Sequence, residues 1–348
     1  MGVLTVSCAG GPDVSTAWLT VADVQGHYTL PYIQSDRTLQ VRLAGIGPAA
    51  VRGVAILRGP GGREGALPVP FTAERPEAVF RDLAPGEYTL AVELQDPAGR
   101  LVRRQAFNRI GVGAVLAAVG DSLTEGYLGL GFKQESLELK AADFPASAVS
   151  RDGRNFPQFA PTSHRYNPSI NCYQSWLPAL NDALAAAWKQ PVFIANEGWG
   201  GYTAADTLAM MRENRDGWRT RMEQLRPATW LIHLGVNDER AKVPAGAFAK
   251  SMGAIVEILV AEFGARPERI YLARPSYDYA DGAEAILKGN IAEIDRLVRE
   301  RNLRAGPDFF AAFSTDKATW YGADPVHPGP AGMERMAQLW AETLCRGE

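Results

Sequence analysis

The chain contains 348 residues, of which 46% are hydrophobic and 22% are charged, proportions of an ordinary globular protein rather than a disordered, collagen-like or coiled-coil one. At one domain per roughly 150 residues, this length predicts about two domains. The 36 basic and 39 acidic side chains give a net charge of −3, so no basic excess indicates binding to nucleic acid. The 3 cysteines are too few for a disulfide framework and lack the spacing of a zinc finger.

The sequence contains no apolar run of the about 18 residues that a membrane-spanning helix needs. The N-terminal stretch MGVLTVSCAGGPD lacks the positive region and the long apolar region of a secretory signal. We therefore expect either a cytoplasmic protein or a mature secreted chain whose signal has been removed.

The first 110 residues contain no lysine and show short alternating patterns. Residues 38–43 and 88–94 alternate polar and apolar side chains, as strands with one buried face do. Turn-forming sequences separate such segments, at residues 59–62, 84–86 and 96–99. This spacing predicts an antiparallel β-sandwich domain over residues 1–110, immunoglobulin-like or fibronectin-like, with a jelly roll as the open alternative.

From residue 111 onward, the pattern changes to alternating strands and helices. Continuous apolar runs, typical of strands buried on both faces, lie at residues 114–119, 191–195, 229–234 and 269–273. Helical patterns lie at residues 174–188, 247–263, 283–301 and 332–344. This alternation predicts right-handed βαβ units and a parallel sheet with helices on both faces over residues 111–348.

One long segment, residues 128–172, shows little periodicity and is rich in Pro, Phe, Ser and Asn. Loops of that length in compact domains are usually functional or disordered. Because the segment follows the first strand of the sheet, we expect it over the sheet's C-terminal edge, where ligands bind in such folds.

A serine directly follows the first of these strands, in the sequence Gly120-Asp121-Ser122-Leu123. A tight turn at that place can expose the Ser122 hydroxyl and direct its backbone N–H at a reacting group. Serine is also favoured as a helix N-cap. Taken alone, this sequence indicates a capping serine about as often as a nucleophile.

Two further motifs follow the second and third apolar runs. The first runs from Asn196 to Thr203 and contains three glycines, which allow close backbone approach or a positive φ. The second is Gly235-Val236-Asn237-Asp238, whose Asn237 amide could donate a hydrogen bond to an oxyanion. Each motif also suits an ordinary turn at the end of a strand.

The chain has 4 histidines as candidate general bases. His327 has an aspartate, Asp324, three residues earlier, which could accept a hydrogen bond from its ring and fix the tautomer. The bland alternative is a solvated surface loop. We expect His233 to be a packed, hydrogen-bonded core residue, His164 to line a pocket or to be exposed, and His27 to have no part in the chemistry.

These four motifs, in this order, resemble those of the SGNH (GDSL-type) hydrolase family. The resemblance covers about residues 112–345 and implies a flavodoxin-like three-layer α/β/α fold for residues 111–348. It implies that Ser122 is the nucleophile, His327 the base and Asp324 its partner. It also implies an oxyanion hole made by the N–H groups of Ser122 and Gly201 and by the Asn237 amide, with Gly200 as the fallback for Gly201.

The implied mechanism is that of a serine esterase. His327 takes the proton of the weakly nucleophilic hydroxyl, an acyl-enzyme forms on Ser122, and water hydrolyses it. No cofactor and no metal are expected, and the sequence contains neither an HExxH motif nor a Cys/His cluster.

For the substrate, we expect a small-molecule or glycan ester with a short acyl group. A lipase would show a broad apolar lid, whereas the 128–172 segment mixes phenylalanines with Arg, Asn and His. Asp121, Trp199 and Trp320 are the candidate substrate-binding residues, since aromatic side chains near polar ones suit stacking on sugars, although core packing is their commoner role. A β-sandwich followed by an SGNH domain also resembles some carbohydrate esterases that remove acetyl groups.

Two alternatives remain open at this point. The same triad could serve a thioesterase, a lysophospholipase or an acyltransferase. The chain could also be a glycan-binding protein with a vestigial hydrolase domain, although none of the four motifs is broken. We expect no nucleic-acid partner and no membrane span, and the oligomeric state is not predicted.

Overall fold

The computed structural model describes residues 18–22, 32–34, 39–44, 52–59, 67–72, 75, 77–126, 175–321 and 324–346. The predictions for the 128–172 segment, for His27 and for His164 lie outside these residues. Contacts between Cα atoms divide the chain into two compact units. Among the described residues, the first unit takes those up to Val115 together with residues 220–226, and the second takes the rest.

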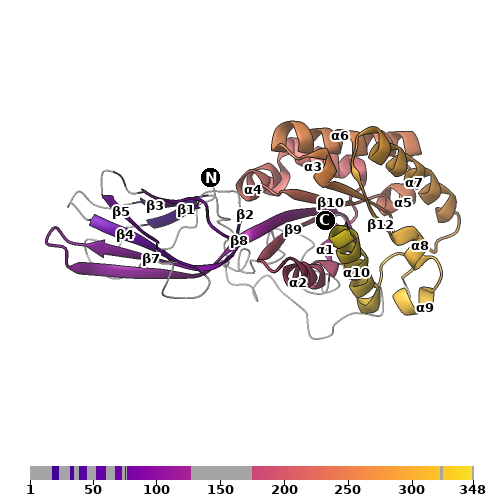
Figure 1. Ribbon diagram of the computed structural model, residues 1–348. Coiled ribbons are helices and arrows are strands. Elements are labelled where there is room, and N and C mark those ends of the chain that lie inside the picture. Colours follow the sequence, from indigo (N-terminus) through magenta and orange to yellow (C-terminus); the bar gives the residue numbers. More distant parts are fainter. Residues whose placement is uncertain are drawn as a thin grey trace, which may run out of the picture. The chain divides into compact units, whose positions relative to one another are not determined.

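The first unit consists mainly of strands (Figure 1). They are β1 (Trp18–Ala22), β2 (Tyr32–Gln34), β3 (Leu39–Ala44), β4 (Arg52–Arg58), β5 (Leu67–Thr72), β6 (Glu77–Phe80), β7 (Gly86–Gln95) and the first part of β8 (Leu101–Gly120). Strands β1, β3 and β6 form an antiparallel sheet. Strands β5, β4, β7 and β8 pair antiparallel in that order, and β2 joins β8 in parallel. The antiparallel strands predicted for this region are confirmed.

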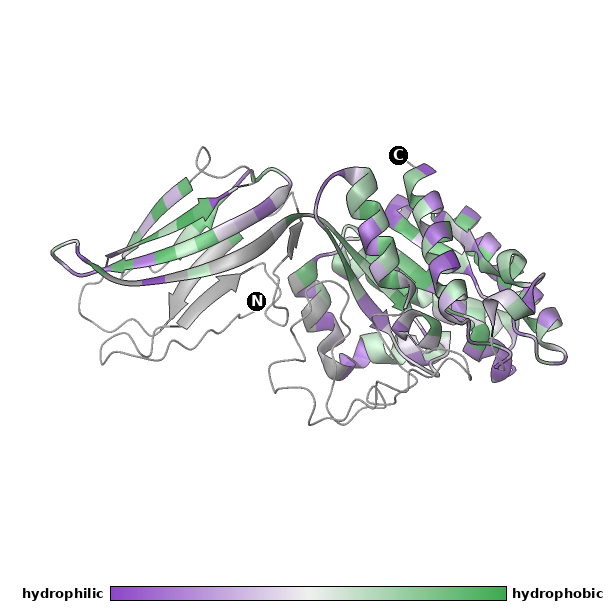
Figure 2. Ribbon diagram, turned by 90° about the horizontal axis from the view of Figure 1, so that it is seen from below, coloured by the Kyte–Doolittle hydropathy of each residue, from purple (hydrophilic) through white to green (hydrophobic). Residues whose placement is uncertain are grey.

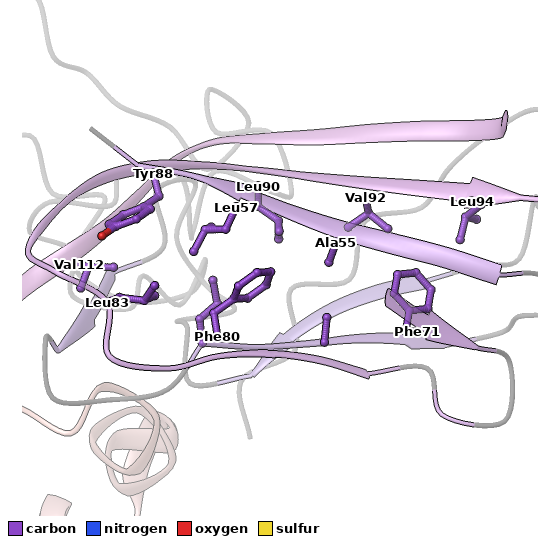
Figure 3. Close-up of a cluster of buried hydrophobic side chains, with 12 residues drawn as sticks. Ala55, Leu57, Phe71, Phe80, Leu83, Tyr88, Leu90, Val92, Leu94 and Val112 are labelled. Atoms are coloured by element: carbon purple, nitrogen blue, oxygen red, sulfur yellow. The ribbon is translucent and has the colours of Figure 1, made fainter. Parts of the chain in front are cut away.

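A cluster of buried hydrophobic side chains draws on both sheets of this unit (Figure 3). Leu39 of β3 and Phe80 of β6 come from one sheet, and Leu57 of β4 and Leu90 of β7 from the other. The alternation predicted for residues 88–94 is present in β7, where every second residue from Tyr88 to Leu94 is buried, and β4 also buries every second residue. The period of two sends these side chains to one face of each sheet, which is where they are removed from water.

The sheet of the second unit contains the end of β8 and four further strands. These are β9 (Val192–Gly198), β10 (Thr229–His233), β11 (Ile270–Arg274) and β12 (Arg304–Asp308). Strands β8, β10, β11 and β12 are parallel, and β9 pairs with β8 on its other side. In chain order this is 2-1-3-4-5, the strand order of flavodoxin-like folds. The α/β fold with a mostly parallel sheet is therefore confirmed.

Helices cover both faces of this sheet. The α-helices are α1 (Ser122–Glu125), α2 (Trp176–Trp188), α3 (Ala204–Glu213), α4 (Trp218–Leu225), α5 (Val236–Arg240), α6 (Ala245–Phe263), α7 (Ala283–Glu300), α8 (Phe309–Phe313), α9 (Lys317–Trp320) and α10 (Pro330–Arg346), and the 3₁₀ helices are η6 (Arg215–Gly217) and η7 (Pro267–Arg269). Helix α2 packs on α10 below the sheet, and α6 packs on α3 and α7 above it (Figure 1). None of the helices in the described parts of the chain has the length and apolarity needed to cross a bilayer.

The hydropathy of the second unit follows this layering (Figure 2). The strands of the sheet are mostly hydrophobic, while the surrounding helices carry both hydrophobic and hydrophilic residues. In α7 the buried residues Leu287, Ile294 and Leu297 recur at helical spacing, which places them on one face of the helix. The strand order reverses between β8 and β10, and ligands bind in such folds outside the carboxyl ends of the strands at that point.

Candidate active site

The turn after β8 carries Ser122. Asp121, not Ser122, is the N-cap of α1, and its Oδ1 accepts a hydrogen bond from the Leu123 N–H at 3.0 Å. The Ser122 side chain is therefore not used as a cap, which rejects the alternative that this serine is a helix N-cap. Gly120 makes the turn possible, because a Cβ there would lie 2.1 Å from Oγ1 of Thr124.

Ser122, His327 and Asp324 form a hydrogen-bonded chain. Oγ of Ser122 lies 2.9 Å from Nε2 of His327, across 205 positions of sequence. On the other side of the ring, Nδ1 of His327 lies 2.7 Å from Oδ2 of Asp324. The two bonds engage both ring nitrogens, so the arrangement has the contacts of a Ser-His-Asp triad.

The other oxygen of Asp324 holds the loop itself in place. Its Oδ1 accepts hydrogen bonds from the backbone N–H groups of Val326 at 2.8 Å and of His327 at 3.0 Å. Burial acts to raise the pKa of Asp324, but the hydrogen bonds from the His327 ring and from these amides outweigh it and lower the pKa to about 2. Asp324 is thus ionised at neutral pH, as the orienting member of a triad must be.

His233 is buried at the end of β10, with 1% of its surface exposed. Its ring packs edge-on against Phe309 at a centroid distance of 4.8 Å. Burial lowers the pKa of His233 to about 3. The predicted packing is confirmed, but the predicted hydrogen bonding is wrong, since neither ring nitrogen has a partner in the described part of the chain. The phenyl ring of Phe309 offers no hydrogen-bond acceptor.

The loop after β9 brings the glycine-rich motif beside α1. Gly198 lies so close to that helix that a Cβ on it would come within 2.2 Å of the Glu125 backbone nitrogen. The N–H of Gly200 donates to Oε2 of Glu125 at 2.8 Å. Gly201 has a φ of +80° and is exposed, and no hydrogen bond to its N–H occurs within the described residues. Of the two candidate glycines, only Gly201 therefore has its amide available.

Asn237 lies in α5, directly after β10 and the turn at Gly235. Its Nδ2 donates to the carbonyl oxygen of Tyr202 at 3.0 Å, which orients the amide and leaves its second N–H for another acceptor. The neighbouring Asp238 is buried and accepts two contacts from the Ala204 N–H, at 3.0 and 3.2 Å. Burial raises the pKa of Asp238 to about 6.

The three candidate substrate-binding residues have different surroundings. Asp121 is fully buried and caps α1, a place that gives it no surface for a substrate. Trp199 is 5% exposed and stacks on Tyr202 at 5.6 Å. Trp320 is half-buried at the end of α9, with its ring edge-on to Phe313 at 5.9 Å. The burial of Asp121 and Trp199 favours a structural part for these two side chains.

Sequence reasoning missed the residues that hold the site together. Glu125 and Asn196 are fully buried and connect α1 to the end of β9 and to the loop after it. Asp238 connects α5 to the start of α3. The available signal was their occurrence inside the four motifs, because a charged side chain in a turn beside a buried strand needs a partner.

Comparison with protein-family models identifies the family of this chain. The GDSL-like lipase/acylhydrolase family matches residues 118–335, which is more than half of the chain. The chain belongs to this family. It is accordingly a carboxylic ester hydrolase of the SGNH class, with a serine nucleophile and a triad.

No curated protein matches this GDSL-like chain significantly. Among solved structures, the chain is similar to a lipase/acylhydrolase from Enterococcus faecalis, with 18% identity, a TM-score of 0.44, and coverage of 66% of this chain and 94% of the other. It is also similar to a carbohydrate acetylesterase from Xanthomonas citri, with 14% identity, a TM-score of 0.48, and coverage of 89% of this chain and 71% of the other. A third similar structure is an esterase from Pseudoalteromonas, with 15% identity, a TM-score of 0.45, and coverage of 67% of this chain and 97% of the other. At such identities and TM-scores, these likenesses extend no property to this chain.

Proposed function

We propose that this protein removes short acyl groups, and in particular O-acetyl groups on carbohydrate, through an acyl-enzyme on Ser122. The observation that carries the proposal is the chain of hydrogen bonds from Oγ of Ser122 through His327 to Asp324, at 2.9 and 2.7 Å. A serine hydroxyl is a weak nucleophile at neutral pH and needs such a base within hydrogen-bond reach.

The proposed reaction starts when Oγ of Ser122 attacks the ester carbonyl and Nε2 of His327 takes the hydroxyl proton. The ionised Asp324 accepts the Nδ1–H of the ring and stabilises the imidazolium. His327 then gives its proton to the departing alcohol, which leaves the acyl group on Ser122. Water, deprotonated by the same nitrogen, attacks the acyl-enzyme and releases the acid.

The oxyanion of each tetrahedral intermediate would be met by three donors. The Ser122 N–H lies in the first turn of α1, where backbone N–H groups lack intrahelical acceptors. The Gly201 N–H and the second N–H of the Asn237 amide complete the set. Gly200, the fallback for Gly201, is less suited because its N–H is held by Glu125.

The proposed substrate class has support from aromatic side chains near the site. Tyr202 follows Gly201, is half-buried, and stacks on Trp199. Trp320 is also half-buried and lies just before the Asp324 loop. Rings that keep one part accessible beside polar groups suit contact with a sugar.

We also propose that residues 1–110 form a β-sandwich accessory domain and residues 111–348 the hydrolase domain. The buried cluster to which both antiparallel sheets contribute supports a sandwich, because two sheets packed face to face share such a core.

An acyl-chain series tests the substrate class. We expect the purified chain to hydrolyse p-nitrophenyl acetate faster than the octanoate and palmitate esters, and to release acetate from acetylated xylan. The Ser122→Ala variant should keep its thermal unfolding midpoint and lose at least about 10³-fold in kcat. Preference for the palmitate ester, or inactivity on acetylated glycans, would reject the acetyl-carbohydrate proposal.

Two other outcomes would name a different activity. Faster turnover of acyl thioesters, or acyl transfer to an added alcohol in place of hydrolysis, would favour a thioesterase or an acyltransferase with the same triad. Wild-type turnover by Ser122→Ala would reject the assignment of the nucleophile. Glycan binding with no hydrolysis of any ester would favour a binding protein.

A further inference from the structure

Glu125 is the last residue of the one-turn helix that begins at Ser122. Its side chain points away from water, with 0% of the residue exposed. Oε2 accepts a hydrogen bond from the Gly200 N–H at 2.8 Å. The triad does not use this carboxyl group, so a fully buried acidic residue beside the nucleophile requires another explanation.

Three consecutive backbone amides fix the end of β9 and the start of the loop after it, and the third of them, that of Gly200, is bonded to this helix. The Gly198 N–H donates to Oδ1 of Asn196 at 3.0 Å, the Trp199 N–H to the Gly120 carbonyl at 2.9 Å, and the Gly200 N–H to Glu125. Gly201 is the first residue of the run whose N–H has no acceptor among the described residues. The loop is thus pinned up to the position before the proposed oxyanion donor.

The partner of Gly198 reinforces the same connection. Nδ2 of the fully buried Asn196 donates to the backbone carbonyl of Glu125 at 3.3 Å, while its Oδ1 accepts from Gly198. Glu125 is therefore bound to the loop by its side chain and to the end of β9 by its main chain. Because Glu125 and Ser122 belong to the same helical turn, these contacts relate the loop directly to the nucleophile.

We propose that Glu125 is a positioning residue for the oxyanion hole. By holding the Gly200 N–H, its carboxyl oxygen restricts rotation about the Gly200 backbone and directs the next amide, that of Gly201, toward the oxyanion formed beside Ser122. The inference rests on the proposed function, because it concerns the donors assigned there. Fixed donors cost no reorganisation during the reaction, which is the source of their effect on rate.

Three substitutions of Glu125 separate the effect of side-chain length from the effect of its negative charge. Glu125→Gln keeps an oxygen acceptor at the same distance from the main chain and removes the acid. Glu125→Asp keeps the acid but shortens the side chain by one methylene group, so the oxygen no longer reaches Gly200. Glu125→Ala removes the acceptor altogether. Leu184→Ala, at a fully buried position of α2 outside the site, controls for loss of stability alone.

The test measures kcat and KM of the full chain and its variants with p-nitrophenyl acetate. We expect Glu125→Asp and Glu125→Ala to lower kcat by about 10- to 100-fold, since a misplaced donor loses much of its effect, with KM changed by less than about threefold. Glu125→Gln should stay within about fivefold of the wild-type kcat. Leu184→Ala should lower the unfolding temperature and keep kcat.

A second measurement follows the rate at which a p-nitrophenyl phosphonate inactivates each variant. The phosphonate also develops negative charge on oxygen as serine attacks, so the Asp and Ala variants should react more slowly by a similar factor. The acid limb of their pH–rate profiles should coincide with that of the wild type, because the triad is untouched. A variant that only unfolds more easily would not show this combination.

Wild-type kcat in Glu125→Asp or in Glu125→Ala would overturn the proposal. A fall in kcat for Glu125→Gln as large as that for Glu125→Asp would also overturn it. The negative charge of the side chain, and not only its length, would then be required. If Glu125→Ala does not fold, the Asp and Gln pair still decides the matter. Wild-type turnover by Ser122→Ala would instead show that the proposed function has failed, whatever Glu125 does.

Discussion

Asp121 and Ser122, adjacent at the start of α1, have different roles. Asp121 caps the helix through its Oδ1, and the Ser122 side chain turns to His327. Both residue types are good caps, so the sequence alone left the choice open. The contact with His327, which lies 205 residues further along the chain, shows that Ser122 is the residue that meets the base and not the cap.

At the same scale, we predict the effect of removing the Asn237 amide. Asn237→Ala should lower kcat on p-nitrophenyl acetate by about 10²–10³-fold, because it deletes one donor to the oxyanion. KM should change little, since the ground-state carbonyl binds the donor more weakly than the oxyanion does. Steady-state kinetics on the purified variant check this.

A matched control for that variant lies in α2. Asn181 is 4% exposed and lies in α2, outside the four motifs, and its Oδ1 accepts no hydrogen bond within the described residues, so Asn181→Ala removes a buried amide that is not an oxyanion donor. It should keep the wild-type kcat. An equal fall in kcat for both variants, or no fall for Asn237→Ala, would contradict the assigned role.

At the scale of elements, the end of β9 and helix α1 are in close contact. Gly198 is the contact point, because a Cβ there would lie 2.2 Å from the backbone nitrogen and 2.8 Å from Cα of Glu125. Backbone atoms cannot move aside as the end of a flexible side chain can. The glycine therefore sets how near the loop approaches the nucleophile helix.

Two glycine substitutions separate crowding from backbone strain. Gly198→Ala should destabilise the protein by at least about 2–3 kcal/mol, because its Cβ overlaps the main chain of α1. Gly201→Ala meets no atom within 4 Å and has only the positive φ of +80° to accommodate, a cost of roughly 1–2 kcal/mol. Denaturant unfolding measures both, and equal costs would contradict the close contact.

Some elements could not be predicted from local patterns. The edge strand β12 (Arg304–Asp308) contains a glycine and a proline and no apolar run. It is a strand because Gly306 allows the main chain to lie close to Ala273 of β11, where a Cβ would approach the backbone at 2.7 Å. Proline is tolerated at such an edge. Pairing with a neighbour therefore overrides local propensity here.

At the scale of the whole molecule, several buried acids affect the pH dependence of stability. Burial raises the pKa of Asp121 to about 7 and that of Asp238 to about 6. Burial and the facing Asp278 raise that of Glu239. Each folded-state pKa lies above the value of about 4 in the unfolded chain, so the native state keeps protons that the unfolded state releases. Their contribution to stability is full below about pH 4 and is lost as the pH rises toward 7.

Asp324 acts in the opposite direction. Its folded-state pKa of about 2 lies below the unfolded value, so its contribution is present above about pH 4 and is lost as the pH falls toward 2.

We predict that Asp121→Asn weakens the pH dependence of the free energy of unfolding between pH 5 and pH 8. Asparagine keeps an oxygen to cap α1 but does not titrate. Relative to the wild type, the variant should gain roughly 1–3 kcal/mol in free energy of unfolding between pH 5 and pH 8. Denaturant melts at the two pH values measure this, and a constant difference between the proteins would show that Asp121 is not protonated in the fold.

The sequence by itself determined the α/β pattern of the second unit, four of its five strands, and the four motifs at the strand ends. It did so because buried parallel strands are continuous apolar runs and because motif residues keep a fixed order along the chain. The tertiary structure alone decided which side chains meet. Glu125 reaches Gly200 because β9 pairs with β8, and Ser122 reaches His327 because the loop before α10 returns to the end of β8. Distances between residues far apart in sequence depend on packing, which local patterns do not encode.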